Sequence, residues 1–402
     1  MNKVKYIIFA ISLAVLNLSA VKAHDVIMDP VSTETEDIIV GADRIDVILS
    51  LTKNKRVGLI ANQTSVLHDG THLLDALVRE GVNVKKVFAP EHGFRGTDDA
   101  GASIENSTDT KTNIPIVSVY GRNNKPTTSQ LSDIDLLIFD IQDVGTRFYT
   151  YISTMHYAME ACAENFVEFV VLDRPNPNDY VDGPVRKAGF SSFVGVDPIP
   201  VLHGLTIGEL ARMINGEGWI STGKKSCKLL VVPMINWSHG KPYSLPVKPS
   251  PNLPNDIAIG LYPSLCFFEG TNISVGRGTT FPFQVLGAPD KKYGKFEFTP
   301  QSIKGMDTNP MHKGKTCFGS DLRNEQFKGG LSLQFVLDFF KKSGYNEKEF
   351  FTRPEWFDLL AGTDVLRKQI INGLNEEEIR KSWENDLNTY REVRNKYLIY
   401  DD

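Results

Sequence analysis

Short, mostly apolar runs alternate with helical patterns over the first half of the chain. The helical segments, such as HLLDALVREG and YTYISTMHYAMEACAE, carry apolar residues at helical spacing, and TIGELARMINGEG adds a capping box. Apolar runs separated by helices predict a parallel sheet covered on both faces. We therefore expect an α/β fold with a doubly wound sheet. The predicted strands are RVGLIA (56–61), VKKVFA (84–89), IPIVSVY (114–120), IDLLIFD (134–140) and EFVVLD (168–173).

A proline-rich segment interrupts this pattern. SHGKPYSLPVKPSPNLP (238–254) has five prolines in 17 residues, which forbids regular structure. We place the domain junction there, with the α/β domain over 40–245 and a smaller α+β domain over 246–402. The second part has a glycine-rich stretch at 270–287 and then helical patterns, and its charged last helix is typical of an amphipathic cover.

The first 23 residues have the pattern of a secretory signal peptide. Lys3 and Lys5 precede an apolar run, and Val-Lys-Ala ends at Ala23 with small residues at both positions that a signal peptidase reads. The apolar run is shorter than the ~20 residues that a membrane-spanning helix needs. We expect cleavage after Ala23 and a secreted or periplasmic protein without a membrane anchor.

Composition and motifs exclude several classes of function. The formal net charge is −5 with both signs mixed along the chain, so there is no basic footprint for nucleic acid. The four cysteines never form CxxC and are expected to be buried apolar residues. No strand is followed by GxGxxG, and GWISTGKK lacks the serine or threonine of a phosphate loop at Lys225. HExxH and GxSxG are also absent, and we expect no cofactor and no metal.

Polar residues follow four of the predicted strands. Because the carboxyl ends of parallel strands meet at one edge of a sheet, where ligands bind, these residues predict a site. They begin at Asn62, at PEHG (90–93), at IQDVGTR (141–147) and at RPNP (174–177). The candidate substrate-binding residues in and just after these segments are Asn62, His92, Arg95, Gln142, Arg147, Tyr149 and Asn176.

Glu91 is the strongest candidate for a catalytic group. Its neighbours Phe88, Ala89, Pro90 and Phe94 are apolar, and such surroundings favour the protonated carboxyl that a general acid needs. The following glycines allow a sharp turn close to a ligand. The alternative is that Glu91 only caps a short helix where a strand ends.

Seven segments in order resemble one family. They are ANQTS, FAPEHGFRG, FDIQDVGTRFYTYISTM, LDRPNP, HGLTIGEL, PSPNLP and FEGTNISVGRGTTFPF. Together they resemble the exo-acting β-N-acetylmuramidases of the NamZ type, long catalogued as a domain of unknown function, over nearly the whole chain from about Val57. The resemblance implies a Rossmann-like domain without a dinucleotide, a smaller C-terminal domain and a cleft between them. It also implies release of N-acetylmuramic acid (MurNAc) from non-reducing ends of peptidoglycan fragments, with the PEHG glutamate, Glu91, in catalysis.

That substrate suggests roles for further residues. Hydrolysis needs a proton for the leaving oxygen and stabilisation of an oxocarbenium-like centre, which carboxyl groups usually supply. Glu91 is the predicted acid, and the second group is Asp140, Asp143 or Glu269, or else the 2-acetamido group of the sugar itself. The lactyl carboxylate of MurNAc calls for an arginine fork. Its candidate readers are Arg95, Arg147 and Arg277.

Other candidates have structural alternatives. Tyr149 and Phe148 could stack on the sugar or belong to the core, and His203 could form a polar wall or be a buried structural histidine. Asn272, near Arg277 in a glycine-rich loop, could cover a ligand or form a packing turn. Two other functions also stay open: an exported amidase or esterase that uses a metal-activated water, and a glycan-binding module without activity. The scattered histidines that the first would need are His92, His156 and His203.

Overall fold

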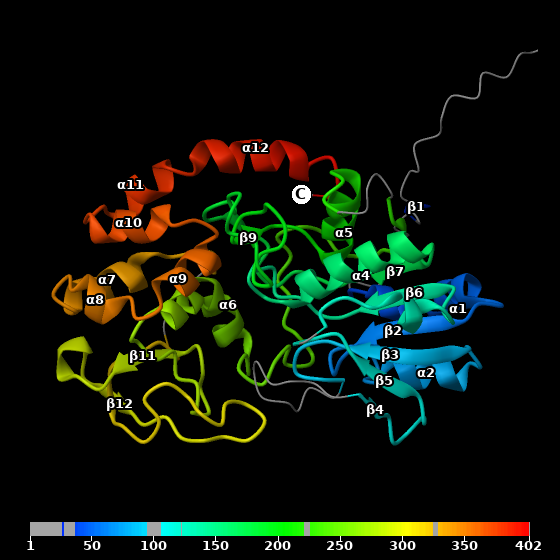
Figure 1. Ribbon diagram of the computed structural model, residues 1–402, viewed down its shortest axis with the longest axis horizontal. Helices are drawn as coiled ribbons and strands as arrows, with labels where there is room; N and C mark the ends of the chain where they lie inside the picture. The colour runs from blue at the N-terminus through cyan, green and yellow to red at the C-terminus, as the bar shows by residue number, and fades with distance from the viewer. Residues whose placement is uncertain are drawn as a thin grey trace, which may run out of the picture.

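The computed structural model has an α/β domain joined to a smaller α+β domain (Figure 1). The predicted signal peptide and Arg95 lie outside the described residues. In the described part, no helix is long and apolar enough to cross a membrane. The structure describes residues 26–27, 37–94, 106–121, 123–220, 226–324 and 329–401.

The first domain is built on an eight-stranded sheet in the order β1-β10-β7-β6-β2-β3-β5-β4. Every neighbouring pair is parallel except β4 and β5. The chain runs outward from β2 through β3 to β5, then returns beside β2 with β6, so the topological switch point lies between β2 and β6. The strands are β1 (Val26–Ile27), β2 (Val57–Ala61), β3 (Val84–Ala89), β4 (Ser107–Thr108), β5 (Pro115–Ser118), β6 (Leu136–Asp140), β7 (Glu168–Leu172) and β10 (Lys228–Val232).

Helices cover both faces of this sheet. Leu59 and Val87 point to the face covered by α1 (Ile45–Thr52) and α2 (Leu73–Arg79). Ile60 and Phe139 point to the other face, which is covered by α3, α4 and α5. The prediction of a doubly wound α/β sheet is confirmed. The helices of the second face are α3 (Thr128–Leu131), α4 (Tyr151–Asn165) and α5 (Ile207–Gly216).

The second domain combines a small antiparallel sheet with short helices. The sheet order is β11-β13-β12, and the helices pack around a core of buried phenylalanines that includes Phe267 and Phe357. This is the α+β domain predicted from the second half of the chain. Its elements are α6 (Asp256–Leu265), η2 (Cys266–Gly270), β11 (Val285–Ala288), η3 (Lys291–Tyr293), β12 (Phe296–Phe298), β13 (Cys317–Asp321), α7 (Gln334–Lys342), α8 (Glu347–Phe350), α9 (Pro354–Ala361), α10 (Val365–Ile371) and α11 (Glu376–Lys381).

The last helix, α12 (Glu384–Arg394), brings the chain back onto the first domain (Figure 1). The Tyr390 hydroxyl donates to the His203 carbonyl at 2.7 Å, and Arg394 Nε donates to the Gly204 carbonyl at 2.6 Å. Beyond the helix, the Tyr400 hydroxyl donates to the buried carboxyl group of Asp173 at 2.7 Å. The C-terminal segment therefore ties the two domains together. His203 ends β9 (Leu202–His203), which pairs with β8 (Val181–Asp182) in a two-stranded antiparallel ribbon, and Gly204 follows β9.

Candidate active site

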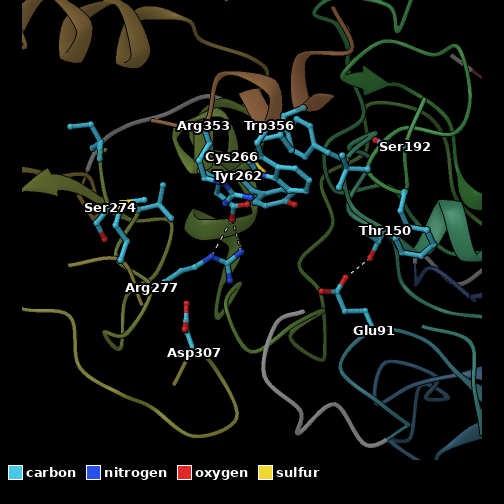
Figure 2. Close-up of a pocket in the computed structure, with 18 of the residues that line it drawn as sticks. Glu91, Thr150, Ser192, Tyr262, Cys266, Ser274, Arg277, Asp307, Arg353 and Trp356 are labelled. Atoms are coloured by element: carbon cyan, nitrogen blue, oxygen red, sulfur yellow. Dashed lines mark hydrogen bonds and ion pairs between the residues drawn. The ribbon is translucent and has the colours of Figure 1, made fainter. Parts of the chain in front are cut away.

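A cavity of about 530 Å³ lies between the carboxyl edge of the parallel sheet and the second domain. Figure 2 shows Glu91 and Arg277 reaching into it from opposite sides. The first domain supplies the turn after β3 and the start of α4, and the second domain supplies α6, η2, the glycine-rich loop and the start of α9. The polar or aromatic lining residues are Glu91, Tyr120, Phe148, Thr150, Ser192, Phe193, Tyr262, Glu269, Ser274, Arg277, Asp307, Arg353 and Trp356.

The turn that carries Glu91 has an unusual backbone. Phe88 and Ala89 are fully buried at the end of β3, and the Gly93 amide closes the turn on the Pro90 carbonyl at 3.0 Å. His92 has φ +68°, a left-handed conformation that is uncommon for a residue with a side chain. Such strain persists only where surrounding packing fixes it, and it is concentrated at functional sites. The turn thus places Glu91 at the cavity wall with little freedom.

Two hydroxyl groups contact the Glu91 carboxyl group. Thr150 is the residue before α4, and its Oγ1 donates to Glu91 Oε2 at 2.6 Å (Figure 2). Burial, and then the Glu91 carboxylate, raise the pKa of Tyr120 above its ordinary value, so this phenol keeps its proton as a donor. The orientation of Glu91 is therefore set by Tyr120, which follows β5, and by Thr150, which precedes α4.

Glu269 and Arg277 form an ion pair on the opposite wall. Arg277 Nη2 and Nε lie 2.6 and 3.1 Å from the same oxygen, Glu269 Oε1. Burial lowers the pKa of Arg277, but the Glu269 carboxylate outweighs it and raises this pKa above its ordinary value. Arg277 therefore stays charged, and both of its contacts use one carboxylate oxygen.

Arg353 is a further cation on the cavity wall. It precedes α9, and its guanidinium carbon lies 5.1 Å from the centre of the Trp356 ring. Among the described residues it has no carboxylate partner, whereas Arg277 is paired with Glu269. Arg353 is therefore the lining cation best placed to meet an anionic part of a ligand.

A smaller recess of about 60 Å³ adjoins the cavity. It shares Glu91, Phe148, Thr150, Tyr262 and Arg277 with the cavity, so the two spaces meet at the candidate acid. The other residues of the recess are His92, Tyr149, Tyr151, Ser250, Asn252, Leu253 and Phe283.

The switch point itself is filled by a network of buried polar side chains. Asp140 accepts from Arg174 Nε at 2.6 Å and from Arg174 Nη2 at 3.0 Å, and both residues are buried. The Asn62 amide oxygen accepts from Thr64, and Gln142 Nε2 donates to the Pro175 carbonyl at 2.7 Å. Asn62, Asp140 and Gln142 are held in these buried contacts and do not line the cavity, contrary to the expectation from the strand ends.

Four other predicted residues also have structural partners away from the cavity. Arg147 is fully buried and donates to the carbonyls of Pro184, Ile199 and Leu360, each at 2.8 Å, and burial lowers its pKa to about 9. It joins the two domains and does not reach the cavity. Asn176 Nδ2 donates to the Leu205 carbonyl, His203 Nδ1 accepts from the Leu205 amide, and Asn272 Nδ2 donates to the Tyr293 hydroxyl at 3.4 Å.

The structure thus brings together only part of the predicted set. Glu91, Glu269 and Arg277 line the cavity, and His92 and Tyr149 line the recess. Phe148 and Tyr149 stand in edge-to-face contact with Tyr262, within the aromatic core. Thr150 lies within the motif FDIQDVGTRFYTYISTM, but no strand-end signal marked the second-domain residues. The residues that sequence reasoning missed are Tyr120, Thr150, Asn252, Arg353 and Trp356.

The three candidate histidines for a metal lie apart. His156 pairs with Asp197 at 2.9 Å, His203 lies 3.7 Å from Asp143, and His92 belongs to the Glu91 turn. Over the described ranges, no group of three or more histidine, cysteine, aspartate or glutamate side chains could hold a metal ion. All four cysteines are free, and all four are buried, which confirms the prediction of their burial.

Two solved structures have the same fold. Both are DUF1343 family proteins from Bacteroides fragilis NCTC 9343. The first is 44% identical with a TM-score of 0.83, over 91% of this chain and 99% of that chain. The second is 32% identical with a TM-score of 0.78, over 91% of this chain and 100% of that chain.

Family models and a curated relative agree with the motif resemblance. The model described as exo-beta-N-acetylmuramidase NamZ, N-terminal, matches residues 57–257, and its C-terminal counterpart matches residues 260–400. The peptidoglycan beta-N-acetylmuramidase NamZ of Bacillus subtilis (strain 168) is 41% identical over 372 residues, 87% of each chain. This chain belongs to the NamZ family of exo-β-N-acetylmuramidases.

Proposed function

We propose that this protein is a glycoside hydrolase that releases MurNAc from the non-reducing ends of peptidoglycan fragments, with Glu91 as general acid. The observation that carries the proposal is the Glu91 carboxyl group, held by Thr150 at 2.6 Å in a cavity whose far wall carries the Glu269–Arg277 pair. Family membership supports the muramidase class, because the Bacillus subtilis relative carries that name.

The carboxyl groups of Glu91 and Glu269 have different roles in this proposal. Glu91 protonates the glycosidic oxygen as the bond to the anomeric carbon breaks, and the sugar passes through an oxocarbenium-like transition state. Arg277 pairs with Glu269 and holds it through Oε1, while Glu269 Oε2 has no hydrogen bond to the described residues. This second oxygen is the one that would face the positive charge or an attacking water.

The size of the cavity supports action on chain ends. At about 530 Å³ it falls in the range of pockets that enclose one small ligand, rather than a long polymer. The second domain, including the start of α9, closes the far side of the cavity. A terminal MurNAc would fill such a cavity, and the remaining glycan would leave through its mouth. The signal-peptide pattern fits this role, because an exported enzyme would meet peptidoglycan outside the cytoplasm.

Arg353 is the residue that we expect to bind the lactyl carboxylate. We expect nitrophenyl MurNAc to be cleaved and nitrophenyl N-acetylglucosamine, which lacks the lactyl group, to be hardly touched. Arg353→Gln should lower kcat/KM for the MurNAc glycoside by roughly 10- to 100-fold, the range for losing a hydrogen bond to a charged group. Arg353→Lys should be intermediate, because lysine keeps the charge but not the paired contact.

A MurNAc glycoside with its lactyl group converted to the methyl ester provides the matched control. It removes the charge from the substrate, so wild type and Arg353→Gln should act on it alike. If Arg353→Gln lowers activity on acid and ester by the same factor, Arg353 does not read the carboxylate. Equal wild-type activity on the MurNAc and glucosamine glycosides would contradict the proposed specificity as a whole.

A further inference from the structure

The recess beside Glu91 contains polar atoms without partners. Asn252 is 2% exposed, and its Oδ1 has no hydrogen-bond partner in the described structure. The same holds for Arg277 Nη1 and for the hydroxyl of Tyr149, which lies next to Tyr151. Leaving a buried polar group unpaired costs about 1–3 kcal/mol. Three such atoms around one recess indicate a place for a polar ligand group.

The orientation of the Asn252 amide is fixed by its other end. Asn252 Nδ2 donates to the Met306 carbonyl at 3.0 Å, and a carbonyl can only accept a hydrogen bond. The nitrogen must therefore face Met306, which leaves Oδ1 as the atom without a partner. The recess thus offers one acceptor, from Asn252, and two donors, from Tyr149 and Arg277.

This set of groups is complementary to a secondary amide. An amide has one N–H donor and one carbonyl oxygen with two lone pairs, which match one acceptor and two donors. Its methyl group would meet the apolar wall formed by Leu253 and Phe283. A single water needs roughly 10–15 Å³ of such space, so about 60 Å³ holds about four to six non-hydrogen atoms, and an acetamido group has four.

We propose that this recess binds the 2-acetamido group of the sugar, with Asn252 accepting its N–H and with Tyr149 and Arg277 donating to its carbonyl oxygen. The inference rests on the proposed function and adds the residues that recognise the N-acetyl group. Tyr149 then acts through its hydroxyl rather than by stacking. Because the recess meets the cavity at Glu91, binding there would set the glycosidic oxygen against the acid.

The lactyl carboxylate fits this recess poorly. A carboxylate is only an acceptor, so Asn252 Oδ1 would face it without a hydrogen bond. Glu91 also lines the recess, and the charge of Arg277 is already compensated by Glu269. The neutral amide is therefore the better occupant of the recess, and the lactyl carboxylate belongs at Arg353.

Two nitrophenyl muramic acid glycosides test the inference, one N-acetylated and one N-hexanoylated. The hexanoyl group exceeds the recess, so wild type should favour the acetyl substrate by at least about tenfold in kcat/KM. Asn252→Ala enlarges the recess and should bring this ratio closer to one. If the alanine variant does not fold, Asn252→Ser can replace it in the test, because serine retains a hydroxyl donor for the Met306 carbonyl. This variant should shift the ratio in the same direction.

Ser192→Ala is the matched control, since Ser192 lines the cavity but not the recess and its hydroxyl also has no partner in the described part of the chain. It should keep the wild-type ratio. Tyr149→Phe should lower kcat/KM for the acetyl substrate about tenfold, for one lost hydrogen bond, without changing the melting temperature.

The outcomes separate the inference from the proposed function. If wild type cleaves neither muramic acid glycoside, the proposed function fails. If it cleaves both at equal rates, or if the folded Asn252 variants keep the wild-type ratio, the function stands and the acetamido recess is wrong. An unchanged rate for Tyr149→Phe would overturn the role of that hydroxyl.

Discussion

Replacing Glu91 with glutamine should leave the protein folded and lower kcat on a natural MurNAc disaccharide by roughly 10²–10⁴-fold, the usual contribution of general acid catalysis. Glutamine keeps the shape of the side chain, and its amide oxygen can still accept from the Thr150 hydroxyl. Only the proton donor is lost. Steady-state kinetics and a melting curve on the same preparation measure both effects.

The leaving group identifies what Glu91 does. Nitrophenolate departs without protonation, so Glu91→Gln should lose much less activity on a nitrophenyl glycoside than on the disaccharide. An equally complete loss on both substrates would assign Glu91 to a nucleophilic or orienting role. Near-normal rates on both would mean that Glu91 only ends a strand.

Replacing Asp140 with asparagine should have a large effect of a different kind. Asp140 and Arg174 form a buried ion pair, and removing one partner leaves an uncompensated charge, at a cost of about 3–5 kcal/mol in the free energy of unfolding. Because Asp140 does not line the cavity, the folded variant should retain a kcat close to wild type. Urea unfolding and kinetics at low temperature separate the two quantities.

A second substitution provides the control for Asp140. Arg174→Met in the Asp140→Asn background removes the orphaned charge, so stability should recover in part, as a double-mutant cycle would show. If Asp140→Asn instead keeps wild-type stability and loses kcat by about 10²-fold or more, the range of a lost catalytic group, Asp140 is the second catalytic carboxylate.

The sheet could be predicted closely because its strands are apolar on both faces. The predicted runs 84–89 and 168–173 correspond to β3 (Val84–Ala89) and β7 (Glu168–Leu172). The segment KLLVV was not recognised as a strand, although it forms β10, because lysines and a proline surround a short apolar run. Local pattern indicates the elements, whereas the pairing of β10 with β7 depends on contacts distant in sequence.

The site was harder to predict, because residue type does not reveal a partner. Glu91 could be found from its apolar neighbours and its motif. Asp140 has the same strand-end position, yet the adjacent strand supplies Arg174, which satisfies it. Arg353 and Asn252 come from a helix start and a proline-rich segment, and only the packing of the second domain brings them beside the strand ends.

Product analysis on a defined glycan is the decisive measurement for exo-acting MurNAc release. A soluble peptidoglycan oligosaccharide that carries MurNAc at its non-reducing end should be incubated with the enzyme and followed by mass spectrometry over time. We expect free MurNAc as the first and only new monosaccharide, together with a chain shortened by that one residue and no cleavage within the chain. Internal fragments at early times, or release of N-acetylglucosamine in place of MurNAc, would contradict exo-acting MurNAc release.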